Sequence, residues 1–203
     1  MSSFSLPIFN HEYETDSLDI NLFSKHLQFL DYHETGAIAA EMGFNGIDLT
    51  VRPNGHVLPE RVKTDLPLAV TAIKKSGINC NIITTAVESI SNTVDVDVLQ
   101  TAADCNIQHY RTNWFKYKEG LSMEESLLFY QEEVKKLGVL NMQIGLIGSY
   151  QNVDSLAIGS SFWEVKKILE TANPIYFGSQ YDIRHAMVEG GNSWENGFRL
   201  LKE

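Results

Sequence analysis

The stretch "DLPLAVTAIKKSGINCNIITTAV", residues 65–87, decides the fold class. Residues 65–77 have the pattern of an amphipathic helix, with Asp65 as the expected N-cap, Pro67 in the first turn and Gly77 as the stop. Residues 78–87 form a short apolar run that predicts a buried strand. A helix that leads through a glycine into a buried strand is a building unit of α/β proteins.

The same unit recurs along the chain. The expected strands cover 20–30 (a strand followed by a turn), 45–52, 78–87, 107–115, 142–152 and 175–183. The expected helices cover 32–43, 65–77, 96–106, 123–141, 160–173 and 193–203. Because a helix follows each strand, the strands are expected to run parallel and to be joined by helical crossovers.

Two architectures accommodate six such units, and the position of the polar residues favours one of them. An open, doubly wound sheet usually carries a glycine-rich phosphate turn after an early strand, and neither GxGxxG nor GxxxxGK[ST] occurs here. Polar residues instead follow the expected strands, as in the mouth of a (β/α) barrel. They are Lys25, His26, Arg52, His56, Thr84, Thr85, Arg111, Trp114, Gln151, Asn152, Asp182 and His185. The sequence therefore predicts an α/β protein with a parallel TIM-type barrel.

Composition narrows the class of partner. The chain has 203 residues, 43% of them hydrophobic and 21% charged, with a formal net charge of −10. An acidic protein without a basic patch is not expected to bind nucleic acid. The beginning of the sequence lacks the features of a secretory signal, and no run reaches the length of a membrane span, so we expect a cytoplasmic protein without a membrane partner. No Gly/Ser/Pro-rich linker divides the chain, which predicts an N-terminal extension over 1–19 and a single domain over 20–203.

Several segments resemble the sugar phosphate isomerase/epimerase family of xylose-isomerase-like TIM barrels. They are "GFNGIDLTVRPNGHVLPERVKTDLPLAV" (43–70), "NIITTAV" (81–87), "YRTNWFKY" (110–117), "SYQN" (149–152) and "QYDIRHA" (180–186). The resemblance implies a divalent metal (Mn, Zn, Co or Mg) at the barrel mouth and isomerisation or epimerisation of a small sugar or polyol. Such a reaction moves a proton next to a carbonyl, which calls for an acid/base group and for a positive charge beside the enediolate oxygens.

The resemblance assigns roles to individual residues. It implies Asp182 as a metal ligand, and His185, three residues later, as the catalytic residue that contacts the substrate. Arg52 and His56 match polar residues of the loop after the second strand. Position at the mouth adds further expected substrate-binding residues, which are Lys25, His26, Arg111, Trp114 and Asn152.

Simpler structural roles compete with these assignments. Asp182 can cap the following turn, His185 can be a loop histidine, and Arg184 is expected in a salt bridge. Asn152 can either bind a substrate hydroxyl or tie down its own turn. "RPNGH" (52–56) is a turn sequence that can order its loop without contacting a ligand.

The sequence departs from the family in its metal ligands and in its length. Family members commonly use Glu, Asp, His and Glu, but Ser149 stands at the position of the first Glu, and Val153 stands where close relatives have His. A complete barrel has about 250 residues, so we expect this sequence to match six βα units and to lack the last two. Of the four expected ligands, Asp182 alone is present.

Two hypotheses follow. The first is a metal-assisted sugar isomerase or epimerase. The second is a catalytically inactive barrel remnant that binds a sugar-like ligand or serves in assembly. An incomplete barrel would also have two free sheet edges and an uncovered apolar interior, which favours association into a homo-oligomer.

Overall fold

The structure, a computed structural model, describes residues 18–202, so the expected N-terminal extension lies almost wholly outside the described residues. Six strands form one sheet: β1 (Asn21–Phe23), β2 (Gly46–Val51), β3 (Asn79–Thr85), β4 (His109–Arg111), β5 (Ile147–Gln151) and β6 (Phe177–Gln180). The α-helices are α1 (Tyr32–Glu41), α2 (Val62–Lys74), α3 (Thr93–Asp104), α4 (Met123–Ile144), α5 (Phe162–Leu169), α6 (Ile183–Gly190) and α7 (Trp194–Leu201). Short 3-10 helices η1 (Ser24–Leu27), η2 (Pro59–Arg61) and η3 (Gly191–Ser193) complete the order.

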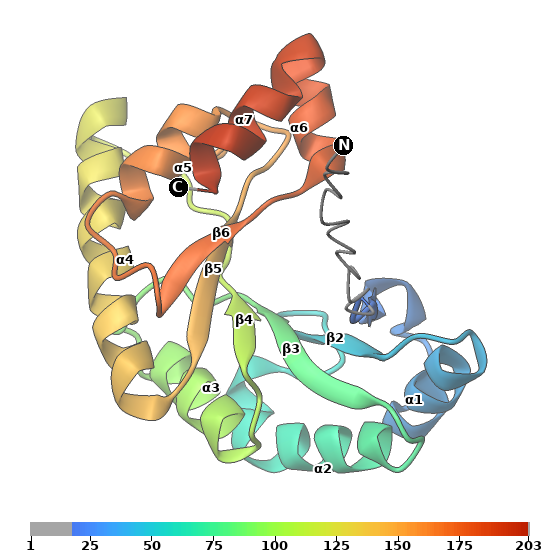
Figure 1. The fold of residues 1–203 in the computed structure, drawn as a ribbon. Coiled ribbons are helices and arrows are strands. Elements are labelled where there is room, and N and C mark those ends of the chain that lie inside the picture. Colours follow the sequence, from blue (N-terminus) through green and yellow to red (C-terminus); the bar gives the residue numbers. More distant parts are fainter. Residues whose placement is uncertain (1–17, 203) are drawn as a thin grey trace, which may run out of the picture.

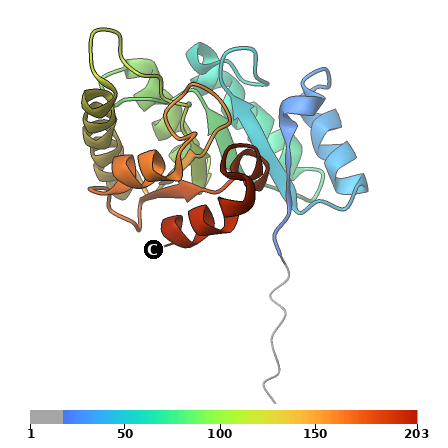
Figure 2. The same ribbon diagram turned by 90° about the horizontal axis from the view of Figure 1, so that it is seen from above.

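The sheet is parallel throughout, and its strand order, β1-β2-β3-β4-β5-β6, is the order along the chain. Figure 1 shows α1 to α5 in an arc on the outer side of the curved sheet, with α6 and α7 at the β6 end, and Figure 2 shows the same arrangement from above. Within the described residues, β1 and β6 do not pair with each other. The expected incomplete α/β barrel is therefore confirmed, whereas association of two chains at the open edges stays a prediction.

The two faces of the sheet differ in chemistry. Residues that point outward toward the helices are apolar and fully buried, for example Ile47, Leu49, Ile83, Tyr110 and Tyr150. Alternate residues of the same strands point to the concave side and are mostly polar: Asp48, Thr84, Arg111, Gln151 and Gln180. The expectation of an uncovered apolar interior was wrong, because strand alternation puts the apolar residues under the helices and leaves a polar interior.

Helices α1 and α4 begin where the sequence places them, whereas α2 and α3 begin three residues earlier than expected and α6 was not expected. Capping boxes start α1 at Asp31 and α4 at Ser122, and Gly145, with a φ of 78°, ends α4 in the left-handed conformation that favours glycine. The predicted N-cap of α2 was wrong. The helix already begins at Val62, after η2, and Asp65 lies in its first turn, where Arg61 Nε is 2.7 Å from Asp65 Oδ2.

The end of β6 differs most from expectation, because the strand stops at Gln180 and α6 begins at Ile183. Asp182 is the N-cap of this helix, and its Oδ1 accepts a hydrogen bond of 2.9 Å from the backbone N–H of His185. The structural role considered for Asp182, capping of the following turn, is therefore present. No helix within residues 18–202 is long and apolar enough to cross a membrane.

Candidate binding and active site

A cavity of about 800 Å³ lies at the carboxyl ends of the strands, the end at which barrels of this type carry their sites. Every strand of the sheet contributes to it, directly or through the loop that follows. Its lining residues are Asp19, Asn21, Phe23, Lys25, His26, Asp48, Arg52, Ile82, Thr84, Arg111, Trp114, Gln151, Gln180, Asp182, Arg184 and His185. A cavity of this size accommodates a small-molecule ligand.

The structure brings most of the predicted site residues together here. Those that line the cavity are Lys25, His26, Arg52, Arg111, Trp114, Asp182 and His185. His56 and Asn152 do not line it, and each has a structural role instead. What any of these residues binds stays a prediction.

His56 lies behind the loop 52–57, in which it was expected to contact the substrate. Its imidazole nitrogens contact the carbonyl oxygen of Leu27 (3.2 Å) and the hydroxyls of Thr35 (3.3 Å) and Thr50 (3.2 Å). Burial lowers the pKa of His56, so the neutral ring is favoured there. With both nitrogens engaged in this way, His56 ties the turn at 52–57 to the sheet, and its expected role as a substrate-binding residue stays a prediction that the cavity lining does not support.

Asn152 holds Asp182 in place rather than a ligand. It is 2% exposed, its Nδ2 donates to the carbonyl of Asp182 (2.9 Å), and its Oδ1 accepts from the backbone N–H of Asp182 (2.6 Å). This pair of hydrogen bonds links the end of β5 to the start of α6. Asn152 is therefore a positioning residue for the Asp182 carboxylate.

Asp48 is the acidic residue that sequence reasoning missed. It lies on β2, and Oδ2 accepts a hydrogen bond of 3.0 Å from the hydroxyl of Thr84, while Oδ1 is buried and has no partner among the described residues. Burial raises the pKa of Asp48 to about 6, although Thr84, Arg111 and Arg52 pull it the other way. The available signal was an acid inside the apolar strand "GIDLTV" (46–51), on the face opposite Ile47 and Leu49.

Arg111 is a fixed buried cation beside Asp48. Arg111 is 4% exposed, and its Nη1 donates a hydrogen bond of 3.0 Å to Gln151 Oε1. The guanidinium also stacks over Trp114, 4.8 Å from the ring centroid. Burial lowers the pKa of Arg111 to about 10, so the group is still charged near neutral pH.

Hydrogen bonds and ion pairs continue from Arg111 to α6. Gln151 Nε2 donates to Asp182 Oδ2 (2.8 Å), and His185 Nδ1 lies 2.8 Å from Asp154 Oδ1. Arg184 forms the expected salt bridge, with Nη1 at 2.8 Å from Asp154 Oδ2. Burial opposes ionisation of Asp154, but the hydrogen bonds from Arg184 and His185 outweigh it and lower its pKa. Every acid on this side of the mouth therefore has partners.

The residues present do not fit the divalent metal that the resemblance implies. No group of three or more His, Cys, Asp or Glu in the described part of the chain could hold a metal ion. Both oxygens of Asp182 already accept N–H groups, from Gln151 and from the backbone of His185. Ser149, at the position of a family ligand, donates its hydroxyl to the carbonyl of Tyr110 (3.1 Å). A hydroxyl and one carboxylate that is already hydrogen-bonded do not replace the carboxylates and imidazoles of such a site.

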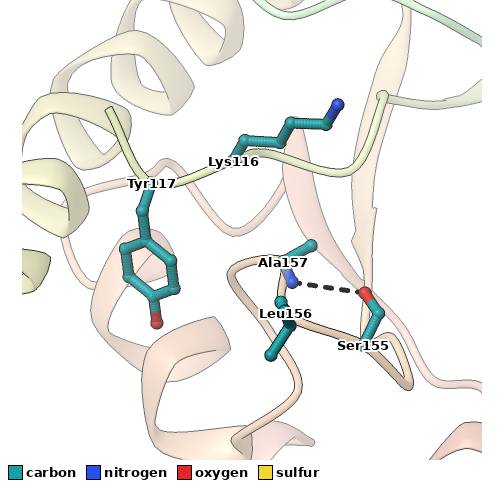
Figure 3. A pocket seen from close by; sticks show the side chains of 5 residues that line it. All are labelled: Lys116, Tyr117, Ser155, Leu156 and Ala157. Atoms are coloured by element: carbon teal, nitrogen blue, oxygen red, sulfur yellow. Dashed lines mark hydrogen bonds between the residues drawn. The ribbon is translucent and has the colours of Figure 1, made fainter. Parts of the chain in front are cut away.

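A second cavity, of about 440 Å³, lies between the segment after β4 and the loop after β5 (Figure 3). It is lined by Lys116, Tyr117, Ser155, Leu156 and Ala157. Its surroundings are mostly apolar; Ser155 Oγ accepts the backbone N–H of Ala157, and the Tyr117 hydroxyl donates to Glu164. With no acid among its lining residues, it is the weaker candidate for proton-transfer chemistry.

Comparison with known proteins gives matches in structure alone: no family model and no curated protein matches the sequence. A 3-keto-D-glucoside 4-epimerase from E. coli superposes with a TM-score of 0.68 at 11% identity, covering 91% of this chain and 76% of that one. A probable 3-DHS dehydratase from Bacillus anthracis gives 0.69 at 13% identity, with 91% and 70% covered. A sugar phosphate isomerase/epimerase from Parabacteroides distasonis gives 0.62 at 10% identity, with 92% and 74% covered. At such low identity these likenesses establish the fold alone: the chain has the parallel β/α architecture of these solved structures, as an incomplete barrel of six strands.

Proposed function

We propose that the protein isomerises or epimerises a small sugar or polyol derivative in the mouth cavity, with Asp48 as the group that moves the proton. The observation that carries this proposal is the buried Oδ1 of Asp48, which has no partner among residues 18–202, in a cavity that three arginines line. A buried carboxylate oxygen without a partner is costly, and a substrate hydroxyl or C–H group in the cavity would give it one.

The acidity of Asp48 suits this role. A general base works best when its pKa is near the pH at which it operates, and the pKa of Asp48, about 6, is close to neutral. At neutral pH most of the group is ionised and can take a proton, and its conjugate acid is strong enough to return it. An ordinary exposed Asp, with a pKa near 4, would be a much weaker base.

Arg111 supplies the positive charge that the reaction needs. Removing a proton next to a carbonyl creates an enediolate, whose negative oxygen must be stabilised. The guanidinium of Arg111 is buried, charged and fixed by Gln151 and Trp114, so it needs no rearrangement as the oxygen charge develops. Because the ligand set does not fit a metal, this mechanism uses no step through one.

His185 stays our candidate for orienting the substrate from the other side. It is held by Asp154, its ring makes an edge contact with Trp114 (5.9 Å between centroids), and its side chain is 12% exposed. Asp48 and His185 come from opposite parts of the strand order, β2 and the helix after β6. A substrate between them would have a polar group on each side.

The second candidate function is binding without turnover. The absence of a metal-ligand set among the described residues, with Ser149 at a family ligand position, favours it. The same cavity would then hold a sugar-like ligand through Arg52, Arg111 and Trp114. The two functions differ in one measurable property, the exchange of a carbon-bound proton with solvent.

The test is proton exchange in D₂O, followed by NMR on a panel of ketoses, aldoses and their acids and phosphates. We expect deuterium at the carbon next to the carbonyl, and a rate lower by about 100-fold or more in Asp48→Asn, as is typical for loss of a general base. Asp97→Asn is the matched control, because Asp97 is a surface acid that pairs with Lys63 outside the cavity. Ligand binding without exchange in the wild type would select the second function, and exchange that survives Asp48→Asn would remove Asp48 from the mechanism.

A further inference from the structure

The mouth cavity is cationic in a chain that is otherwise acidic. Its charged lining side chains, apart from histidines, are four cations (Lys25, Arg52, Arg111 and Arg184) and three acids (Asp19, Asp48 and Asp182). The whole chain, in contrast, has 16 basic and 26 acidic residues. The balance of charge at the mouth is thus opposite to that of the chain, and it favours a negatively charged ligand.

Two of these cations have no acidic partner within residues 18–202. Arg184 pairs with Asp154, and Arg111 is bonded to Gln151 and stacked on Trp114. Lys25 and Arg52, by comparison, form no ion pair with any acid among residues 18–202.

Arg52 and Lys25 lie on neighbouring strand ends. Arg52 directly follows β2, Lys25 lies in η1 directly after β1, and these two strands pair with Phe23 opposite Asp48. The Arg52 guanidinium is 5.7 Å from the centroid of the Phe23 ring, so it extends back over the end of β1. Both side chains line the cavity on the side of Asp48.

The backbone that carries Arg52 is held firmly. The turn 52–57 is closed by hydrogen bonds from Gly55 N to Arg52 O (2.8 Å) and from Arg52 N to Val57 O (3.1 Å). A Cβ at Gly55 would stand 2.9 Å from the carbonyl oxygens of Arg52 and Thr50, so this tight turn requires glycine there. His56 anchors the same turn through Leu27, Thr35 and Thr50, which gives that histidine an indirect part in the site.

We infer that Arg52, assisted by Lys25, binds an anionic group of the ligand, a carboxylate or a phosphate, so that the substrate is an acidic derivative of a sugar rather than a neutral sugar. A guanidinium offers two parallel N–H donors to either group, and its placement on a rigid turn limits the entropy lost on binding. The inference deepens the proposed function and rests on it for the identity of the reacting part of the molecule. The anionic end occupies the Arg52 side, and the reacting carbon lies next to Asp48.

Calorimetry with ligands of one carbon skeleton tests this inference without any turnover. The probes are D-glucitol, D-gluconate, D-glucitol 6-phosphate and inorganic phosphate. We expect at least one sugar anion to bind about ten-fold or more tightly than D-glucitol, and this advantage to shrink as NaCl is raised. D-gluconate and D-glucitol 6-phosphate distinguish a carboxylate from a phosphate site.

Arg52→Gln should abolish the advantage of the sugar anion over D-glucitol, whatever affinity for D-glucitol remains. Arg199→Gln is the matched control, because Arg199 lies on α7 outside this cavity and pairs with Glu195. Arg52→Lys, which keeps the charge but loses the paired donors, should be intermediate. The melting temperature of each variant shows whether it is folded. If Arg52→Gln is not folded, the anion preference of Arg52→Lys is compared with that of wild type instead.

Three results would overturn the inference. They are equal affinity for D-glucitol and both sugar anions, inorganic phosphate bound as tightly as D-glucitol 6-phosphate, and an anion preference that persists in Arg52→Gln. Failure here is separable from failure of the proposed function. If Asp48→Asn stops proton exchange but Arg52→Gln changes no ligand affinity, the anion site alone is refuted. If Arg52→Gln abolishes the anion preference but Asp48→Asn leaves proton exchange unchanged, the proposed chemistry alone is refuted.

Discussion

The two sides of the mouth differ in how completely their polar groups are paired. On the β5–β6 side, Gln151, Asp182, His185 and Asp154 form one connected set of hydrogen bonds and ion pairs. On the β1–β2 side, Asp48 has an unpartnered oxygen, and Arg52 has no acidic partner among the described residues. A satisfied set of bonds stabilises the fold and positions side chains, whereas polar groups of a cavity that lack protein partners can bond to a ligand. The resemblance to the isomerase family predicts site residues on the first side, at Asp182 and His185. The polar groups that lack protein partners lie on the second side.

The largest effect expected on stability comes from the ionisation of Asp48. Since its pKa is raised from 3.8 to about 6 in the folded protein, the folded state binds more protons than the unfolded state between these values, and stability falls as pH rises from about 4 to about 6. The full difference corresponds to at most about 3 kcal/mol. Asp48→Asn should remove this fall, so its advantage over wild type grows from pH 4 to pH 6 and is constant above.

Urea unfolding at several pH values measures this difference directly. Asp97→Asn should follow the wild-type curve, because Asp97 is a surface acid. A constant offset between wild type and Asp48→Asn across this range would mean that Asp48 titrates normally and that the two sides of the mouth are alike.

Asp182→Ala should cost about 2 kcal/mol on the paired side. The substitution removes the N-cap of α6 and the acceptor of Gln151, and loss of a cap alone costs about 1 kcal/mol. For a chain of this length the melting temperature should fall by about 4–8 °C. Asp182→Asn keeps a capping side chain and should recover most of the loss; if it is as unstable as Asp182→Ala, the charge rather than the cap is what matters.

His56→Ala should cost about 1–2 kcal/mol, because it leaves the hydroxyls of Thr35 and Thr50 and the carbonyl of Leu27 without their shared partner. It should also weaken the preference for anions, since the Arg52 turn loses its anchor. Thermal melting and the calorimetric series measure the two effects. His33, an exposed histidine on α1, provides the control through His33→Ala. A destabilised His56→Ala with the wild-type anion preference would separate the turn from the site.

The contrast between the two sides also explains what could be predicted from sequence. The barrel could be predicted, because parallel strands and crossover helices are encoded by local apolar patterns such as that of 65–87. The mouth could be predicted in outline, because polar residues after strands reach one end of the sheet, as Arg111 and Asp182 do. Asp48 was missed because it lies inside a strand rather than after one, and its one signal in the sequence is its alternation with the apolar residues Ile47 and Leu49. His56 and Asn152 follow strands too, and whether such a side chain points into the mouth or back into the fold depends on partners distant in sequence, such as Leu27 and Asp182.

The smallest effect is expected at the outer end of the paired side, in Asp154→Asn. Arg184, its ion-pair partner, is 72% exposed, so breaking this solvent-screened pair should leave the melting temperature almost unchanged. The contact of Asp154 with His185 is less accessible, and its loss should lower ligand affinity about two- to three-fold by loosening the imidazole. Thermal melting and calorimetry with D-gluconate measure both, with Asp97→Asn again as the control. If Asp154→Asn destabilises the protein as much as Asp182→Ala does, the hydrogen bonds and ion pairs from Gln151 to Arg184 act as one structural unit. The small effect that we expect would mean that the Asp182 cap alone stabilises the fold and that His185 is available to bind a ligand.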